Sequence, residues 1–190
     1  MKQLVLEPTT QAQWRLLVHE AQSVCARRLD EVLESYLVFL LMRFTDKPEF
    51  TARIMAKEFL HSQNSSGRKQ VDQLRDVGDQ CLLFSGLFPQ LAEKRLVRIS
   101  YYVNLGKSSY HQLSGLLDRG SAMVYSHLSE AFVVLMDILQ AMRELGGERV
   151  LTPLQAMELW EDTGSERAYH AVCTRTDSIP IPITGNTSRH

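Results

Sequence analysis

Residues 74–117 read LRDVGDQCLLFSGLFPQLAEKRLVRISYYVNLGKSSYHQLSGLL. Apolar residues recur every three or four positions in the first half of this stretch and again from Ile99 to Leu117, which is the spacing of one face of an α-helix. Gly78 and Gly106 occupy positions on these faces where core side chains are expected. Because a glycine inside a helix costs about 1 kcal/mol relative to alanine, two of them on inward faces indicate a compensating need.

Three explanations of these glycines are consistent with the sequence. The first is close crossing of two helices, which we favour because a missing Cβ lets neighbouring backbones approach. The second is room for a bound ligand between the helices that carry Gly78 and Gly106. The third concerns Gly106 alone: Asn104-Leu105-Gly106 could end one helix in a left-handed cap, with Ser108 starting another.

Three helices are predicted before this stretch. Thr10 and Gln13 have the spacing of a capping box, so the first helix is expected to begin there. An unbroken i, i+3, i+4 series over residues 29–44 predicts the second. The pattern leaves open whether these two helices are continuous or break near residues 27–30. Pro48 suits the first turn of a third helix, which is expected to end at Gln63.

The second of these helices is apolar on every side from Tyr36 to Met42. Such a helix belongs in the middle of a bundle or at an interface between molecules. The sequence alone does not decide between these two places.

Further helices are predicted after residue 117. Ser121 is expected to cap a long helix that ends at Gly146-Gly147. Thr152-Pro153-Leu154-Gln155 combines an N-cap threonine, a proline at the first helical position and a glutamine at the third, which predicts another helix start. Residues 165–175 add a last short helix. From Asp177 onward, alternating prolines without a helical period predict an extended, mobile tail.

No stretch alternates apolar and polar residues for long enough to predict a strand. The sequence therefore predicts an all-α fold, a bundle of about six to eight helices. A chain of 190 residues is long enough for one well-buried core. We expect a single helical domain over residues 1–176, followed by the tail over residues 177–190.

Charge and cysteine usage limit the classes of function. Lys and Arg number 21 against 22 for Asp and Glu, so the basic surface typical of nucleic-acid binding is missing. Cys25, Cys81 and Cys173 are far apart and odd in number, which favours a reducing cytoplasm. No apolar run approaches the about 20 residues needed to span a bilayer, and the N-terminal residues lack the apolar core of a signal peptide.

Five residues are candidates for a ligand-binding site: Asp79, Tyr102, Tyr110, His111 and His127. Asp79 follows Gly78 among apolar residues, where a buried carboxyl needs a partner, and an ion pair with Arg75 one turn earlier is the simpler expectation. The tyrosines are expected to be core residues or to line an amphipathic pocket. His127 lies on the apolar stripe of its predicted helix, where a hydrogen-bonded core histidine is the favoured interpretation over a metal or haem ligand.

Glu58-x-x-His61 has the ligand spacing of di-iron helical bundles. That architecture requires a second such pair and two more carboxylates, which the sequence does not contain. The sequence also contains no phosphate loop, no zinc motif and no nucleophile elbow. We therefore predict no metal and no cofactor, and the sequence leaves open whether the protein is an enzyme.

One set of short motifs resembles a known group of proteins. It consists of Tyr36-Leu37-Val38, Gly78-Asp79, residues 83–89 (LFSGLFP), Tyr101-Tyr102, and Leu105-Gly106 with Tyr110. Over residues 29–117 the chain is similar to a group of uncharacterised bacterial all-helical proteins. The resemblance implies a bacterial, cytoplasmic origin and brings no activity, cofactor or site residue with it.

These observations favour a protein that acts by binding, either to a protein partner or to itself as a homodimer. The alternative is a small-molecule pocket or an enzyme site between the helices that carry Gly78 and Gly106. We expect no nucleic-acid partner and no membrane span.

Overall fold

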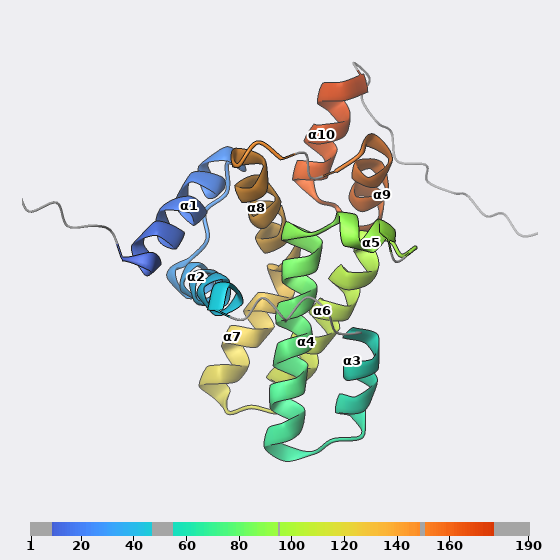
Figure 1. The fold of residues 1–190 in the computed structure, drawn as a ribbon. Coiled ribbons are helices and arrows are strands. Elements are labelled where there is room, and N and C mark those ends of the chain that lie inside the picture. The colour runs from blue at the N-terminus through green and yellow to red at the C-terminus, as the bar shows by residue number, and fades with distance from the viewer. Residues whose placement is uncertain (1–8, 47–54, 95, 149–150, 177–190) are drawn as a thin grey trace, which may run out of the picture.

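The computed structural model describes residues 9–46, 55–94, 96–148 and 151–176. The predicted tail, residues 177–190, and the predicted start of the third helix at Pro48 lie outside the described residues. Within the described ranges the fold is all-α, as predicted, and contains no strand (Figure 1). Its helices are α1 (Thr10–Val24), α2 (Glu31–Asp46), α3 (Met55–Gln63), α4 (Gly67–Leu87), α5 (Gln90–Lys94), α6 (Ile99–Ser114), α7 (Arg119–Glu130), α8 (Phe132–Leu145), α9 (Pro153–Thr163) and α10 (Glu166–Thr176).

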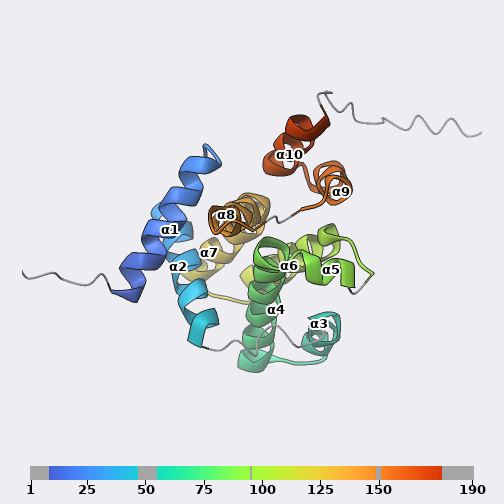
Figure 2. The same ribbon diagram turned by 45° about the horizontal axis from the view of Figure 1, so that its top comes forward.

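Helix α4 lies at the centre of the bundle. It packs against α6, α8 and α3, while α1 packs against both α2 and α8 (Figure 1). Figure 2 shows α1 and α2 on one side of α4, with α9 and α10 on the other. The hairpin of α9 and α10 contacts the rest of the bundle through α6 and α8. One cluster of buried apolar side chains extends from Val18 on α1 to Val172 on α10.

The capping predictions have mixed outcomes. The capping box at Thr152 and Gln155 is confirmed, because each side chain accepts from the backbone N–H of the other. The first helix is capped by Thr9 and not by Thr10, since the Thr9 hydroxyl accepts from the N–H of Ala12. Two adjacent threonines present almost the same pattern, which explains the error of one residue.

The helix predicted from Ser121 to Gly146 was wrong in its start and in its continuity. Asp118 is the N-cap, and its carboxylate accepts from the N–H of Ser121. The helix breaks at Ala131, and α7 and α8 meet there at 65°. No single described helix has the length and apolarity to span a bilayer; α7 and α8 have them only as this bent pair.

The connection between α1 and α2 is a turn that side chains hold in place. The Leu29 N–H donates to Oε1 of Gln22 at 2.7 Å, and the Leu33 N–H donates to Oδ1 of Asp30 at 2.9 Å. Ala26 has a φ of 49°, which a residue with a side chain rarely adopts. The two helices are therefore separate, which decides the question that the pattern left open.

The apolar run of α2 lies mainly in the core of the bundle. Leu37, Val38, Leu40 and Leu41 are buried, whereas Phe39 is 57% exposed. An interface between molecules at this exposed side stays a prediction.

The helices that carry Gly78 and Gly106 are in close contact. A Cβ at Gly78 would lie 2.6 Å from Cδ1 of Tyr110, and a Cβ at Gly106 would lie 2.9 Å from Cβ of Cys81 and closer still to the Phe132 ring. Aromatic side chains therefore fill the space at both glycines. Helix α6 continues through Gly106, so the proposed left-handed cap at that residue was wrong.

Gly86 also lies at a close contact between two helices. It lies in the last turn of α4, and a Cβ there would come within 2.8 Å of Cδ1 of Leu139 on α8.

We expect Gly106→Ala to lower the free energy of unfolding by about 1–3 kcal/mol, because the added methyl group overlaps the Phe132 ring. This loss outweighs the gain in helix propensity of about 1 kcal/mol. Gly120→Ala on α7 is the control: its Cβ would be 3.6 Å from the nearest atom, a side-chain oxygen of Asp118. Urea unfolding measures both variants, and a Gly106→Ala protein as stable as the wild type would contradict the packing argument.

Candidate functional site

A buried polar cluster lies where α2, α4 and α6 meet. Its centre is the carboxylate of Asp79, of which 1% is exposed. Oδ1 of Asp79 accepts from the phenol groups of Tyr36 at 2.5 Å and Tyr110 at 2.7 Å. Oδ2 of Asp79 accepts from the guanidinium group of Arg43. Three side chains from two other helices thus share one buried carboxylate.

Burial and the negative charge of Asp79 keep both phenols protonated. Desolvation, and then the negative charge of Asp79, raise the pKa of Tyr36 and of Tyr110 well above the ordinary value of tyrosine. The two rings also contact each other edge to face, with centroids 6.3 Å apart. Both phenols therefore remain hydrogen-bond donors to Asp79 at physiological pH. Within this cluster, the two phenols and the guanidinium group of Arg43 all donate to the carboxylate of Asp79.

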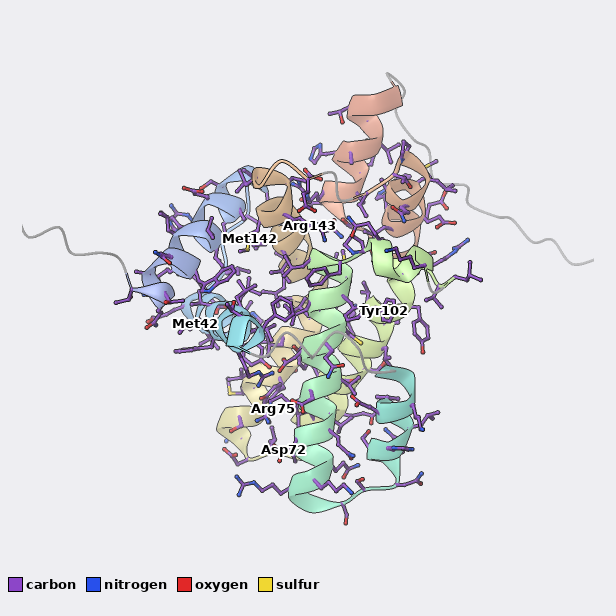
Figure 3. All side chains as sticks on the ribbon, viewed as in Figure 1. Met42, Asp72, Arg75, Tyr102, Met142 and Arg143 are labelled. Atoms are coloured by element: carbon purple, nitrogen blue, oxygen red, sulfur yellow. The ribbon has the colours of Figure 1, made fainter. Side chains whose placement is uncertain are left out.

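The structure brings together two of the five predicted site residues, Asp79 and Tyr110. Tyr102 is buried elsewhere on α6, where its ring contacts those of Phe84 and Tyr101 (Figure 3). His111 is exposed on the outer side of α6. The five residues therefore do not surround a common space, and a ligand-binding role for them stays a prediction.

Two expectations about these residues were wrong. His127 is not a core histidine: 45% of its side chain is exposed, and its Nδ1 lies 3.3 Å from a carboxylate oxygen of Asp30. The bend at Ala131 turns α7 so that its stripe no longer continues that of α8. Arg75 does not pair with Asp79; it donates to Asp72, one turn earlier on α4, at 3.0 Å (Figure 3).

Sequence reasoning missed Arg43 as the partner of Asp79. The signal was present, because Arg43 is the only cation between Glu31 and Asp46 and directly follows the apolar run from Tyr36 to Met42. A charge in that setting needs a counter-charge. Nothing in the sequence, however, shows that it lies beside a residue on α4.

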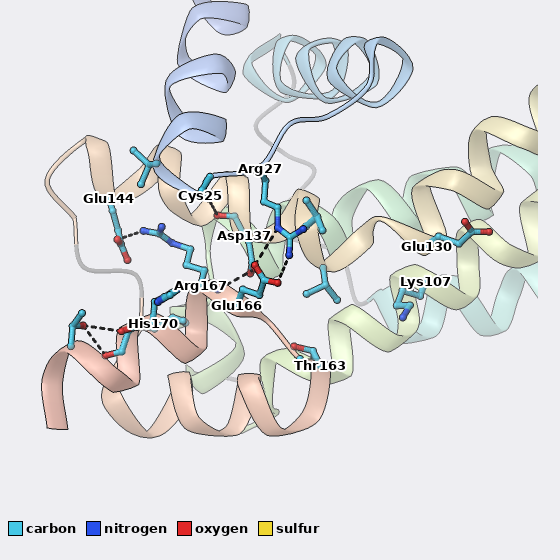
Figure 4. A pocket seen from close by; sticks show the side chains of 18 residues that line it. Cys25, Arg27, Lys107, Glu130, Asp137, Glu144, Thr163, Glu166, Arg167 and His170 are labelled. Atoms are coloured by element: carbon cyan, nitrogen blue, oxygen red, sulfur yellow. Dashed lines mark hydrogen bonds and ion pairs between the residues drawn. The ribbon is translucent and has the colours of Figure 1, made fainter. Parts of the chain in front are cut away.

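A cavity of about 580 Å³ lies on the other side of α8 (Figure 4). Its walls are the end of α1 with the following turn, the face of α8, and the hairpin of α9 and α10. Figure 4 shows Arg27 reaching Glu166 beside Asp137 in its middle, the Arg167 side chain directed towards Glu144, and Lys107 and Glu130 at one end. The apolar part of the wall consists of Val24, Val133, Val134, Leu151 and Ala171.

Asp137 forms the floor of this cavity and is only 8% exposed. Its Oδ1 accepts from the Ser165 hydroxyl at 2.6 Å, and its Oδ2 accepts from the backbone N–H of Arg167 at 3.4 Å. These donors lie at the N-terminus of α10, where a negative charge is favourable. Burial nevertheless raises the pKa of Asp137 to about 6. The Asp137 cavity, as we name it, therefore contains a carboxyl group that titrates close to neutral pH.

Ion pairs connect the hairpin to the rest of the bundle across this cavity. Arg27 in the turn after α1 pairs with Glu166, and Arg167 on α10 pairs with Glu144 on α8. The Cys25 thiol lies in the same wall and donates to the backbone carbonyl of Asp137 at 3.6 Å. Burial raises the pKa of this thiol. The hairpin is thus attached here by polar contacts, which exchange with water more readily than a packed core does.

No sequence pattern predicts this cavity. The only signal is Asp137 itself, a lone carboxylate in the apolar run FVVLMDIL. Asp79 has a second signal, the adjacent Gly78, which Asp137 does not have. Metal binding is not suggested here: no group of three or more His, Cys, Asp or Glu side chains in the described ranges is arranged to hold an ion. Glu58 and His61 lie on α3 without such companions.

We expect Arg43→Met to lower the free energy of unfolding by about 2–3 kcal/mol, because it leaves the buried charge of Asp79 with neutral donors only. Arg75→Met is the matched control: Arg75 and Arg43 are equally exposed, at 35%, but the partner of Arg75, Asp72, is 48% exposed, so a loss of less than about 1 kcal/mol is expected. Chemical unfolding at neutral pH distinguishes them. Equal losses for the two variants would show that the buried pair has no special weight.

Asp137 predicts a pH dependence of stability. Its pKa is 3.8 when unfolded and about 6 when folded, so the folded protein binds the proton more tightly. This contribution is therefore fully present below pH 4 and is lost as the pH rises from about 4 to about 6. Unfolding titrations at a series of pH values should show this decrease in the wild type and not in Asp137→Asn. A decrease of the same size in both proteins would assign it to other groups.

Comparisons of this chain with protein-family models, with curated proteins and with solved structures found no match. The proposed function therefore depends on the geometry of the described residues alone.

Proposed function

We propose that this protein acts by binding, and that the Asp137 cavity holds an extended segment of a protein partner. The observation that carries the proposal is the cavity itself, with a volume of about 580 Å³. That volume lies within the range of about 300–1,000 Å³ typical of ligand sites. A site between a helical hairpin and the body of a bundle is also a usual place for one.

The chemistry of the walls favours a peptide. Val24, Val133 and Val134 offer apolar contact to side chains, while Arg27 and Glu166 at the rim can exchange their ion pair for bonds to a backbone or to charged side chains. The rim carries both signs of charge, which suits a segment with few charges of its own. A compact polyanion or polycation would meet repulsion from one half of the rim.

A cytoplasmic location belongs to the same proposal. It is supported by three thiols that are free in the structure, Cys25, Cys81 and Cys173. The bacterial origin implied by the resemblance over residues 29–117 is compatible with it.

A second candidate is self-association through α2, which the exposure of two apolar residues on that helix favours. Phe39 is 57% exposed and Val32 is 49% exposed, two turns apart. Such a pair is a small patch and gives at most a weak dimer. Sedimentation velocity at two concentrations tests it: a strict monomer excludes the homodimer.

We expect Val24→Trp to weaken peptide binding about tenfold or more, because the indole ring enters the Asp137 cavity. The probes are peptides selected on the wild-type protein from a random display library. Leu16→Trp is the matched control, since Leu16 lies on the same helix, is 60% exposed and does not line the cavity. Selected peptides that bind the Val24→Trp protein as well as the wild type would contradict the proposal.

The same variants separate a peptide from a small molecule. Native mass spectrometry of the purified wild-type protein is the measurement. A small molecule that remains bound to the wild type and to Leu16→Trp, but not to Val24→Trp, would assign the cavity to a small ligand instead.

A further inference from the structure

We infer that residues 177–190 of this chain are themselves an occupant of the Asp137 cavity and compete there with the partner. This inference rests on the proposed function, because it takes the cavity to be a binding site. Four observations carry it: the position of α10, the length of the segment, its sequence and the walls of the cavity.

The segment starts next to the cavity. Helix α10 forms one of the walls with His170, Ala171 and Thr174, and it ends at Thr176, two residues after the last of these. Residues 177–190 therefore begin at one end of the cavity and need only turn back along α10 to enter it.

The segment is also long enough. Its fourteen residues reach about 46 Å as an extended strand at about 3.3 Å per residue. Helix α10, with 11 residues, is about 16 Å long. A segment that turns back at Thr176 can thus run past the whole of α10 and retain several residues for the turn itself.

The sequence of the segment suits the apolar part of the cavity wall, Val24, Val133, Val134, Leu151 and Ala171. Ile179, Ile181 and Ile183 alternate with Pro180 and Pro182. Each proline removes a backbone N–H and favours an extended conformation of the residue before it. Such a strand places the three isoleucines on one side and takes few unsatisfied donors into the cavity.

The charges of the two surfaces agree as well. Between Ser178 and Ser188 the segment carries no charged side chain. The rim of the cavity already neutralises itself through the pairs of Arg27 with Glu166 and of Arg167 with Glu144. An uncharged segment therefore brings no charge that would oppose either sign, and it displaces the Arg27–Glu166 pair as the partner does.

Because the segment belongs to the same chain as the cavity, it can occupy the cavity even with a low intrinsic affinity. A segment tethered beside its site has an effective concentration of the order of millimolar. Occupancy by this segment lowers the apparent affinity for a partner by the fraction of time the cavity is free. A partner therefore binds only when its affinity is high enough to displace the tethered segment.

Cys25 in the cavity wall provides the readout. In the full chain, maleimide labelling of Cys25 is followed by mass spectrometry in the wild type and in the triple variant Ile179→Ser, Ile181→Ser and Ile183→Ser. If the segment fills the cavity nine-tenths of the time, the triple variant is labelled about tenfold faster. The matched control, Thr184→Ser with Asn186→Ser and Thr187→Ser, keeps the isoleucines and should label at the wild-type rate.

Cys81 is fully buried and serves as an internal check on the fold, since it should stay unlabelled in all three proteins. Equal rates at Cys25 in the wild type and in the triple variant would overturn the inference. Protection of Cys25 that increases with protein concentration would overturn it too, because the segment would then come from a second copy.

Peptide binding separates this inference from the proposed function. The triple variant should bind the selected peptides about tenfold more tightly than the wild type, because the competitor is gone. If the selected peptides bind both proteins equally and Cys25 is labelled at equal rates, the proposed binding function is retained and the inference of a competing segment is refuted. Faster labelling in a triple variant that binds no peptide would instead refute the proposed function and leave the segment as a permanent cover.

Discussion

The close contact between α4 and α6 is the constraint on which the rest of the structure depends. It exists because Gly78 on α4 has no side chain where the ring of Tyr110 must lie, and Gly106 on α6 has none where Cys81 of α4 must lie. A ring placed directly on a helix backbone gains dispersion contacts over its whole face. The same approach brings the Tyr110 phenol within 2.7 Å of Asp79. Packing and the buried polar cluster are therefore one arrangement, since the glycine beside Asp79 admits the ring that satisfies it.

The two buried carboxylates of the bundle are stabilised in different ways, and this difference separates a structural position from a candidate site. Asp79 has a cation and two phenols as partners and lies in space filled by rings. Asp137 has a hydroxyl and one backbone N–H, and it forms the floor of an open cavity. Its pKa is raised to about 6, as expected for a carboxyl whose desolvation its donors only partly offset. Beside Asp137, α10 meets α8 through the Ser165 hydroxyl, the Arg167 N–H and the Arg167–Glu144 pair.

The break at Ala131 makes that cavity accessible. A straight helix from Arg119 to Leu145 would carry the stripe of α7 and α8 along one line. The bend of 65° turns α7 away, so that Glu130 and Lys107 form one end of the cavity and His127 faces Asp30 at the surface. One local departure from helical geometry thus moves a predicted core histidine to the surface and opens the space beside α8.

The sequence by itself determined the helical class, the inward faces of most helices, the start of α9 and the importance of Gly78, Gly106 and Asp79. These features depend on local periodicity, on caps and on the absence of a side chain, all of which neighbouring residues encode. Only the tertiary structure decided that Asp79 pairs with Arg43 and not with Arg75, that α7 and α8 are bent, and that Asp137 lies at a cavity. Each of these depends on residues that are distant in the chain, and no local pattern fixes which distant surfaces meet.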